Sequence, residues 1–407
     1  MYVYVLSNNG VPLMPTSNCA KVRALLRQGR AKVVRRTPFT IRLMYDTTAY
    51  VQNITLGVDA GSKTIGVSAT AGENEVYAAQ VLPRNDVSNK LKARSEFRHA
   101  RRYRKKRYRQ ARFDNRVKSK HKGWLAPSVE NKINTHLQAI SLALRLMPIR
   151  RVVIETAEFY NGRQKAEVES TDKQERYKEQ NLRQIVLNRD NYTCRCCNGK
   201  SGKLYVVPAE GKRTGSVDDL YTVCKQCFEN HAKTRQPYPF RKKRFLADST
   251  FMGIMRKTLI ARAREMFRGI EIEETFGSVT KGIREQHDIP KSYINDARCI
   301  SGKPLAKPLE YFYLFKAVRS HNRQIHKATI SKGGKRKLNQ TPKYVFGFQL
   351  FDKVRCKGSV GFVFGRRTTG AFRIVKLDGE VLSTGINYKK LKLLEGRKSL
   401  LCELVPA

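Results

Sequence analysis

The alternation of apolar and polar positions predicts short strands early in the chain. The apolar run Leu56–Val58 ends at Asp59, and Gly61 permits a tight reversal before a second β-prone run at 64–69. This pattern is typical of a β-hairpin or a bulged turn. Another strand is predicted at 75–82. We therefore expect Asp59 to lie at the exposed end of a strand.

A helix and a further strand are predicted next. Ser128 begins a segment whose apolar residues recur at helical spacing and which ends before Pro148. The apolar stripe consists of Val129, Ile133, Leu137, Ile140 and Leu144. The chain then enters the β-prone run 151–154, which ends at Glu155. Strand, helix and strand around carboxylates predict an α/β sheet of the ribonuclease H type.

Three acidic residues occupy similar positions in these predicted elements. Asp59 and Glu155 end strands, and Asp296 heads a predicted helix, after a helix at 250–267 and a strand at 270–275. A two-metal nuclease needs carboxylates on rigid elements, so that one metal activates water and the other stabilises the leaving oxygen. Acids also end strands for structural reasons, so position alone leaves both interpretations open. The three carboxylates are the candidate catalytic and metal-binding residues.

Two β-rich modules flank these elements. Residues 1–50 predict strands at 3–6, 31–34 and 39–44, with a helix between the first two. From 348 to 388, short β-prone runs punctuated by glycine predict a small antiparallel barrel.

The charge of the chain changes the picture. Among 407 residues, 81 Lys and Arg face 34 Asp and Glu, a formal charge of +47. A charge of this size indicates a polyanionic partner, because neutralised phosphates release counterions and supply affinity. Nucleic acid is the expected partner.

The most basic stretch covers residues 90–120. It contains no Gly or Pro, so a long helix is predicted, but its apolar positions make no stripe wide enough to bury. Arginine suits phosphate contacts and interleaved tyrosines stack on bases, which favours RNA; the alternative is a disordered basic tail. The predicted nucleic-acid-binding residues are Arg94, Arg98, Arg101, Arg102, Arg104, Lys105, Arg107, Arg109, Arg112 and Arg116.

Four of the nine cysteines form two CxxC pairs, Cys194 with Cys197 and Cys224 with Cys227. Such pairs present four thiolates to one tetrahedral Zn²⁺, and a site filled by sulfur is structural rather than catalytic. Cys196 competes for one ligand position, and four free cysteines are the alternative interpretation. The cysteines do not resemble a disulfide framework, residues 1–6 are too short for a signal-peptide core, and no apolar run of eighteen residues occurs. We expect a soluble, intracellular protein.

Taken in order, these motifs resemble the IscB family, the transposon-encoded RNA-guided nucleases that are similar to the ancestors of the large CRISPR effector nucleases. The resembling motifs are Pro12–Pro15 (the PLMP module), Val58–Lys63, Ile154–Glu155 and Asn295–Cys299 (three RuvC motifs) and Arg101–Lys105 (the bridge helix). The resemblance implies that Asp59, Glu155 and Asp296 are RuvC metal ligands, and that the basic helix contacts guide RNA and its heteroduplex with DNA.

The resemblance also implies a division of the chain: a ribonuclease H-like RuvC core split by an arginine-rich helix and a zinc-binding HNH-type insert, with a C-terminal β-barrel. The expected segments are a PLMP-like module at 1–50, RuvC parts at 51–88, 123–160 and 246–320, the bridge helix at 89–122, a linker with the zinc insert at 161–245, and a basic barrel at 321–407 that reads a DNA motif beside the target.

One departure from the family concerns the HNH insert, whose histidine activates water beside a metal. No histidine occurs between His136 and His231. The positions that match the HNH residues are Val207, Pro208, Asp219 (or Asp218) and Phe228. Val207, Pro208 and Phe228 have no side-chain group that can act as a general base at neutral pH, and the aspartate occupies the position where the family has Asn. We expect an inactive, zinc-stabilised HNH remnant.

A second departure is Tyr293, where the family usually has a histidine three residues before the aspartate. The segment 161–181 also departs from the family pattern.

The sequence therefore predicts an RNA-guided DNA-binding protein that nicks one strand through the RuvC centre with Mg²⁺ or Mn²⁺. Its expected partners are a non-coding guide RNA and a double-stranded DNA target, with the protein monomeric in the ribonucleoprotein and bound to no membrane. A bacterial cytoplasmic location is expected, with an organelle as the alternative. Two other functions stay open: a nuclease-inactive guided binder acting in regulation or transposition, and an RNA-binding factor without a DNA target.

Overall fold

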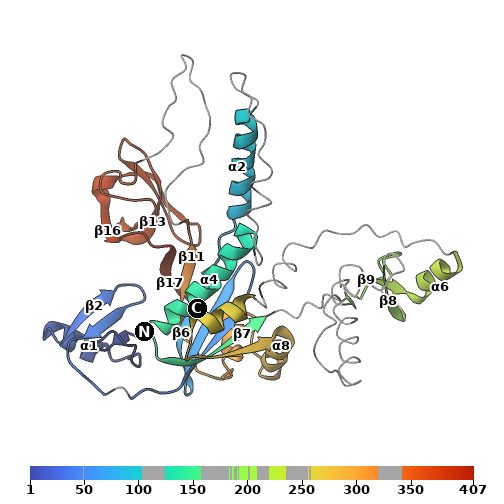
Figure 1. The fold of residues 1–407 in the computed structure, drawn as a ribbon, viewed down its shortest axis with the longest axis horizontal. Helices are drawn as coiled ribbons and strands as arrows, with labels where there is room; N and C mark the ends of the chain where they lie inside the picture. Colours follow the sequence, from blue (N-terminus) through green and yellow to red (C-terminus); the bar gives the residue numbers. More distant parts are fainter. Residues whose placement is uncertain are drawn as a thin grey trace, which may run out of the picture. The chain divides into compact units, whose positions relative to one another are not determined.

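The computed structural model describes residues 1–48, 50–102, 124–156, 183, 186–187, 190, 192–199, 202–208, 220–234, 255, 258–319 and 342–407. The chain divides into two compact units, one comprising 1–157 and 255–407 and the other 158–254 (Figure 1). Several predicted residues lie outside the described ones: Arg104, Lys105, Arg107, Arg109, Arg112, Arg116, Asp218, Asp219 and the linker at 161–182.

The first unit is built on a seven-stranded mixed sheet with the strand order β10-β7-β4-β5-β6-β11-β17. Its strands are β4 (Ile54–Asp59), β5 (Ile65–Ala71), β6 (Asn74–Leu82), β7 (Ile149–Thr156), β10 (Glu271–Phe276), β11 (Tyr311–Ala317) and β17 (Leu400–Pro406). Strands β4, β5 and β6 form an antiparallel meander, and β7 and β10 add to it in parallel with β4. This arrangement confirms the predicted α/β class, the hairpin after Asp59 and the strand that carries Glu155.

The helices of this unit are α2 (Val87–Arg102), α4 (Pro127–Leu144), α8 (Gly277–Gln286) and α9 (Tyr293–Ile300). Helix α9 lies on β4 and β5, α8 contacts α9 and β10, and α2 contacts α4. The predicted apolar stripe of α4 is confirmed, because Ile133, Leu137 and Ile140 are buried. Pro127 begins α4, where its missing N–H breaks no helical bond. Residues 258–266 are also helical and are tied to α4 by two hydrogen bonds from Arg262 to Glu130, of 2.6 and 3.1 Å. Among the described residues, no helix is both long and apolar enough to cross a membrane.

The N-terminal module matches its prediction. Strands β1 (Tyr4–Leu6), β2 (Ala31–Arg35) and β3 (Thr40–Leu43) form a sheet in the order β1-β3-β2, and α1 (Cys19–Arg27) packs against it. Its apolar core includes Val3, Val22 and Ile41.

The prediction of a closed C-terminal barrel is wrong. Strands β12 (Lys353–Cys356), β13 (Ser359–Arg366), β14 (Ala371–Val375), β15 (Val381–Asn387) and β16 (Leu391–Glu395) form an open antiparallel sheet in the order β15-β14-β13-β12-β16. The edges β15 and β16 are joined by a short 3₁₀ helix, η2 (Tyr388–Lys390), and do not pair. The final strand β17 instead pairs with β11 in the large sheet. Register shifts, including one between Val363 and Gly365, show that glycine punctuation here marks bulges and turns rather than closure.

In the second unit, the described residues form a hairpin of β8 (Leu204–Pro208) and β9 (Leu220–Cys224), followed by α6 (Lys225–Thr234). Their apolar core is small, with Cys194, Val207 and Val223 buried.

Candidate functional site

Strand pairing brings Asp59 and Glu155 together. Asp59 is the last residue of β4, and it lies directly opposite Glu155 on the parallel neighbour β7. Since parallel strands run about 4.8 Å apart, two carboxylates project from the same edge of the sheet. The structure therefore places these two acids close together, as predicted.

Helix α9 brings the third carboxylate to the same place. A Cβ at Gly57 would lie 2.0 Å from the carbonyl oxygen of Ala297, and one at Gly66 would lie 1.9 Å from that of Tyr293. The helix thus rests directly on the backbones of β4 and β5, which only glycine permits. The Ser292 side chain caps α9 by accepting the Asn295 N–H at 3.1 Å, and Asp296 follows in the first turn.

The electrostatics indicate that the three acids share one environment. The pKa of Asp59 is raised to about 8, chiefly by burial and then by the negative charges of Glu155 and Asp296. Burial also raises the pKa of Glu155 and of Asp296, and Lys291 opposes the shift in all three. Three partly desolvated carboxylates repel one another when ionised, so a cation stabilises this arrangement.

Helix α8 supplies two contacts that sequence reasoning missed. The Thr280 hydroxyl donates a hydrogen bond to Glu155, which lies beside Gly277 in the first turn of α8. Arg284, one turn further along, places its Nε 3.2 Å from Oδ1 of Asp296, and the two side chains are 15% and 16% exposed. No motif marks these residues, although Thr and Arg at i and i+4 place both side chains on one helical face.

The site fits a hard divalent cation. Oδ1 of Asp296 is buried and has no hydrogen-bond partner among the described residues, since its contact with Arg284 lacks hydrogen-bond geometry. Carboxylate oxygens are the ligands that Mg²⁺ and Mn²⁺ prefer. Among the described residues, the four cysteines are the group of potential ligands whose atoms all lie within 4.8 Å of one another, so the three carboxylates are more widely spaced than that.

Tyr293 stands at the first position of α9. Its backbone carbonyl faces Gly66, while its side chain is 47% exposed. The tyrosine is therefore a surface residue at the rim of the acidic site and contributes its backbone to the packing of α9.

The four predicted zinc ligands do come together. The sulfur atoms of Cys194, Cys197, Cys224 and Cys227 all lie within 4.8 Å of one another, and those of Cys197 and Cys224 are 3.8 Å apart. Four sulfurs around Zn²⁺ at about 2.3 Å are separated by about 3.8 Å in a tetrahedron. This cluster can hold zinc, and it does not include Cys196.

The electrostatics of the cluster favour one thiolate in particular. Burial acts to raise the pKa of Cys194, but backbone hydrogen bonds from Cys197, Cys224 and Cys196 outweigh it and bring the pKa to about 6. Thiolates are the form that binds metal.

The positions that match the HNH residues carry no acid–base group in the described part of this unit. Val207 is buried, Pro208 ends β8, and the ring of Phe228 stacks on Tyr205 with centroids 4.9 Å apart. Val207 thus belongs to the small apolar core, whereas Phe228 is exposed on one side and contacts Tyr205 on the other.

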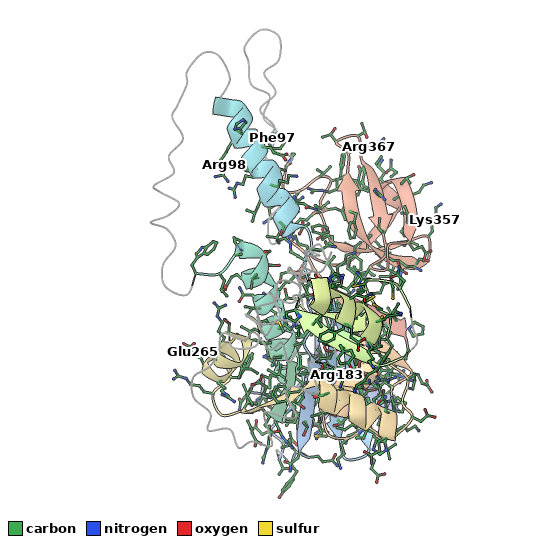
Figure 2. The ribbon with its side chains drawn as sticks, turned by 90° about the vertical axis from the view of Figure 1, so that its right-hand side faces the viewer. Phe97, Arg98, Arg183, Glu265, Lys357 and Arg367 are labelled. Atoms are coloured by element: carbon green, nitrogen blue, oxygen red, sulfur yellow. The ribbon has the colours of Figure 1, made fainter. Side chains whose placement is uncertain are left out.

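The described part of the predicted basic helix is α2. Residues 87–99 are helical and none of them is buried; Arg94 and Arg98 are exposed, and Arg101 and Arg102 continue the helix (Figure 2). A helix that is polar all round gains little from packing, as expected for a surface that binds phosphates.

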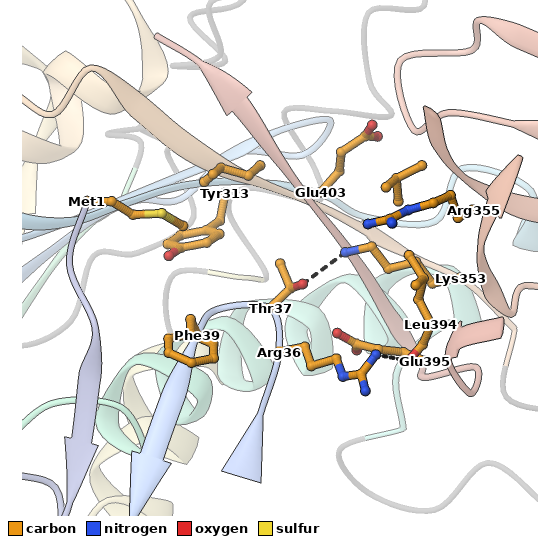
Figure 3. Close-up of a pocket in the computed structure, with 12 residues that line it drawn as sticks. Met1, Arg36, Thr37, Phe39, Tyr313, Lys353, Arg355, Leu394, Glu395 and Glu403 are labelled. Carbon is orange, nitrogen blue, oxygen red and sulfur yellow. Dashed lines mark hydrogen bonds between the residues drawn. The ribbon is translucent and has the colours of Figure 1, made fainter. Parts of the chain in front are cut away.

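A cavity of about 380 Å³ lies away from the carboxylates, where the N-terminal module, the large sheet and the C-terminal sheet meet (Figure 3). Lys353 donates to Thr37 Oγ1 at 2.9 Å and to the Cys402 carbonyl at 3.1 Å, and Arg36 reaches the Leu394 carbonyl at 3.4 Å. These contacts connect the N-terminal module to the C-terminal sheet.

Comparison with known proteins gives one family match. Residues 3–176 match the model of a family described as RRXRR protein, and this stretch contains Arg-Arg-Tyr-Arg-Lys at 101–105. No curated protein matches the chain.

Two solved structures show weak similarity. One is Streptococcus thermophilus Cas9 in complex with the GGAA PAM: 11% identity, TM-score 0.26, covering 52% of this chain and 30% of that one. The other is Cas9 of the same organism with the AGAA PAM: 15% identity, TM-score 0.13, covering 53% and 18%. The matched parts are thus less than a third of those proteins, and such TM-scores do not establish a common fold.

Proposed function

We propose that the chain is an RNA-guided DNA nuclease of IscB type that nicks one strand. The observation that carries this proposal is the convergence of Asp59, Glu155 and Asp296 at one sheet edge, fixed by strand register and by the contact of α9 with Gly57 and Gly66. The strand order β6-β5-β4-β7-β10, with the first three strands antiparallel, is the order of a ribonuclease H-type core such as RuvC. The charge of +47 supports nucleic acid as the partner.

In this proposal, Asp59, Glu155 and Asp296 hold Mg²⁺ or Mn²⁺. The bound ions supply an activated water and stabilise the leaving oxygen of the phosphodiester. Thr280 orients the Glu155 carboxylate, and Lys291 contributes positive charge at the site. The four cysteines hold a structural Zn²⁺, and the surrounding insert, the HNH remnant, performs no chemistry.

The remaining parts of the proposal follow the resemblance. The first 50 residues are the PLMP-like module, α2 and the basic run after it contact the guide RNA, and the open C-terminal sheet reads the DNA motif beside the target. The protein acts as a monomer within a ribonucleoprotein in the bacterial cytoplasm.

The test uses the chain purified with the RNA it carries and a supercoiled plasmid that matches that RNA. We expect relaxed circles in Mg²⁺. Asp59→Ala should reduce nicking to background and leave DNA binding intact, whereas Asp46→Ala, a change at an exposed acid outside the site, should nick normally. Nicking that survives Asp59→Ala would overturn the assignment.

Arg284 gives a second prediction that needs no cleavage. Its guanidinium neutralises Asp296 in the metal-free protein, so Arg284→Gln should lower the free energy of unfolding by about 1–3 kcal/mol, because a buried carboxylate loses its partner. Mg²⁺ should raise the Tm of the variant more than that of the wild type, because the guanidinium no longer competes for Asp296.

Lys281→Gln is the matched control, since Lys281 lies on the same helix and pairs with Glu285 at the surface. It should leave the free energy of unfolding within about 0.5 kcal/mol of wild type, and the Mg²⁺-induced rise in Tm should match that of wild type. Equal Mg²⁺ responses in wild type and Arg284→Gln would show that the cation does not compete with Arg284.

A nuclease-inactive guided binder is the second candidate. It is favoured by Tyr293, exposed where the family has histidine, and by Phe228, a residue without acid–base chemistry that stacks on Tyr205. DNA that is bound by the RNA-loaded chain but stays uncut in Mg²⁺ and in Mn²⁺ would decide for this function.

A further inference from the structure

Two aromatic rings are stacked at the surface of the C-terminal sheet. Phe346 and Tyr388 lie 4.1 Å apart between ring centroids with an interplanar angle of 9°. Phe346 is 48% exposed, and Tyr344, two residues earlier, is 52% exposed. We call Tyr344, Phe346 and Tyr388, with the flanking Lys389 and Lys390, the aromatic platform. Tyr388 is partly buried and packs against the apolar core of the sheet, whereas Phe346, stacked on it, is exposed.

The platform is held in place by the backbone around it. Phe346 has a φ of +47°, a left-handed conformation that is uncommon for a bulky residue. Gly370, with a φ of +87°, lies beneath the rings, and a Cβ there would be 2.8 Å from Tyr388 and 3.3 Å from Phe346. Arg366 donates to the carbonyls of Pro342, Lys343 and Phe348 at 3.1, 2.7 and 2.7 Å, which fastens both ends of the loop. Strained backbone kept by such supports is typical of binding surfaces.

The charge around the platform is positive. Lys389 and Lys390 follow Tyr388 directly, and Lys343 places its Nζ 5.1 Å from the centre of the Tyr344 ring. Arg367 belongs to the same turn as Gly370 and lies at one end of the sheet (Figure 2).

The acids of the C-terminal sheet are engaged elsewhere. Asp352 is buried and accepts backbone N–H groups of Gln349 and Arg397, and Glu380 pairs with Lys376 at the β14–β15 turn. Flat aromatic faces beside unneutralised cations suit a base attached to a phosphate.

We propose that the aromatic platform stacks an unpaired base of single-stranded RNA, with the adjoining phosphates on Lys389, Lys390 and Arg367. The inference rests on the proposed function, which supplies RNA as the partner. Duplex DNA keeps its base faces stacked within the helix, whereas RNA loops and bulges present unpaired bases to aromatic side chains. The neighbouring segment 320–341 contains no Asp or Glu, so its charge does not complement the platform.

The experiment uses the full chain freed of RNA, without added Mg²⁺, and a single-stranded oligouridylate that carries one 4-thiouridine. Fluorescence anisotropy measures affinity, and photocrosslinking followed by mass spectrometry locates the base. We expect a crosslink at Phe346 or Tyr388. The double change Phe346→Ala with Tyr388→Ala should weaken binding about 5- to 150-fold, the range for loss of a stacked base.

The salt dependence separates stacking from charge. The double aromatic change should leave the slope of log affinity against log salt unchanged. Lys389→Ala with Lys390→Ala should instead reduce that slope by about 1.4, or about 0.7 for each phosphate that the protein no longer neutralises.

Conservative variants guard against misfolding. Phe346→Tyr and Tyr388→Phe keep both rings and should bind like the wild type, as should Tyr50→Ala, which removes an aromatic ring that is 88% exposed outside the platform. Wild-type affinity of the double alanine variant with an unchanged Tm would overturn the inference, as would crosslinks that map elsewhere. A matched oligodeoxyribonucleotide that crosslinks at the platform in preference to RNA would also overturn it, in favour of single-stranded DNA.

Binding is measured without Mg²⁺ and nicking with it, so the two proposals can fail separately. Nicking without a crosslink at the platform removes only this inference, and a crosslink without nicking removes only the nuclease.

Discussion

Replacing Gly57 with alanine is expected to displace helix α9 and to disperse the acidic site. The new Cβ would lie 2.0 Å from the carbonyl oxygen of Ala297 and 2.6 Å from the amide nitrogen of Ser301. Both are backbone atoms of a helix end that is also fixed by a 3.0 Å hydrogen bond from Thr70 to Ser301. No rotamer change relieves such contacts, so the helix has to move. We expect a loss of about 3 kcal/mol or more in the free energy of unfolding, the upper end for overpacked cores.

Urea unfolding measures this loss, and hydrogen exchange of the α9 amides locates it. Gly282→Ala is the matched control: it adds the same methyl group to α8, where no atom lies within 4 Å of the new Cβ. Because alanine is the better helix former, this control should stabilise the protein by up to about 1 kcal/mol. If Gly57→Ala unfolds at the same urea concentration as wild type, α9 is not held as described.

Loss of the four-cysteine site is expected to unfold the small hairpin-and-helix module while the first unit stays intact. The described core of this module consists of Cys194, Val207 and Val223, too little apolar surface to fold alone. Structural zinc contributes about 10–16 kcal/mol of binding free energy in small zinc domains, so its removal should abolish the fold. Cys224→Ser, or the zinc chelator 1,10-phenanthroline, should expose residues 192–234 to rapid hydrogen exchange.

Cys196→Ser provides the internal comparison, because Cys196 packs against the cluster without belonging to the four-sulfur group. It should retain one zinc per chain by elemental analysis and the wild-type exchange pattern. Rapid exchange of residues 192–234 in Cys196→Ser, or none in Cys224→Ser, would contradict this assignment of ligands.

Local pattern was sufficient to predict much of this fold. Burial on one side of an element sets the periodicity of its apolar residues. This periodicity is present in the alternation around Asp59, in the helical stripe on α4 and in the run before Glu155. The clustering of the four cysteines was predictable because two CxxC pairs are a spacing that brings four sulfurs together. Each of these features depends on residues close together in the chain.

The features that were missed depend on contacts between distant segments. The contacts of Thr280 with Glu155 and of Arg284 with Asp296 arise only when α8 packs beside β7. The C-terminal barrel was predicted wrongly because glycine marks a bulge and a closing corner alike, and because the partner of β17 lies more than eighty residues earlier, in β11. The requirement for glycine at position 57 likewise could not be predicted from the sequence, because it arises from the close contact with α9.

The partners of β10 and β17 also bear on how such a chain can change. In sequence, the whole second unit with its four-cysteine cluster lies between β7 and β10, which pair with each other. The open C-terminal sheet lies between β11 and β17, which also pair. Each module is a long insertion between two strands that are neighbours in the large sheet. Modules attached in this way can be exchanged, shortened or inactivated without breaking a strand pair of the core. Both points of attachment are therefore natural places for grafting.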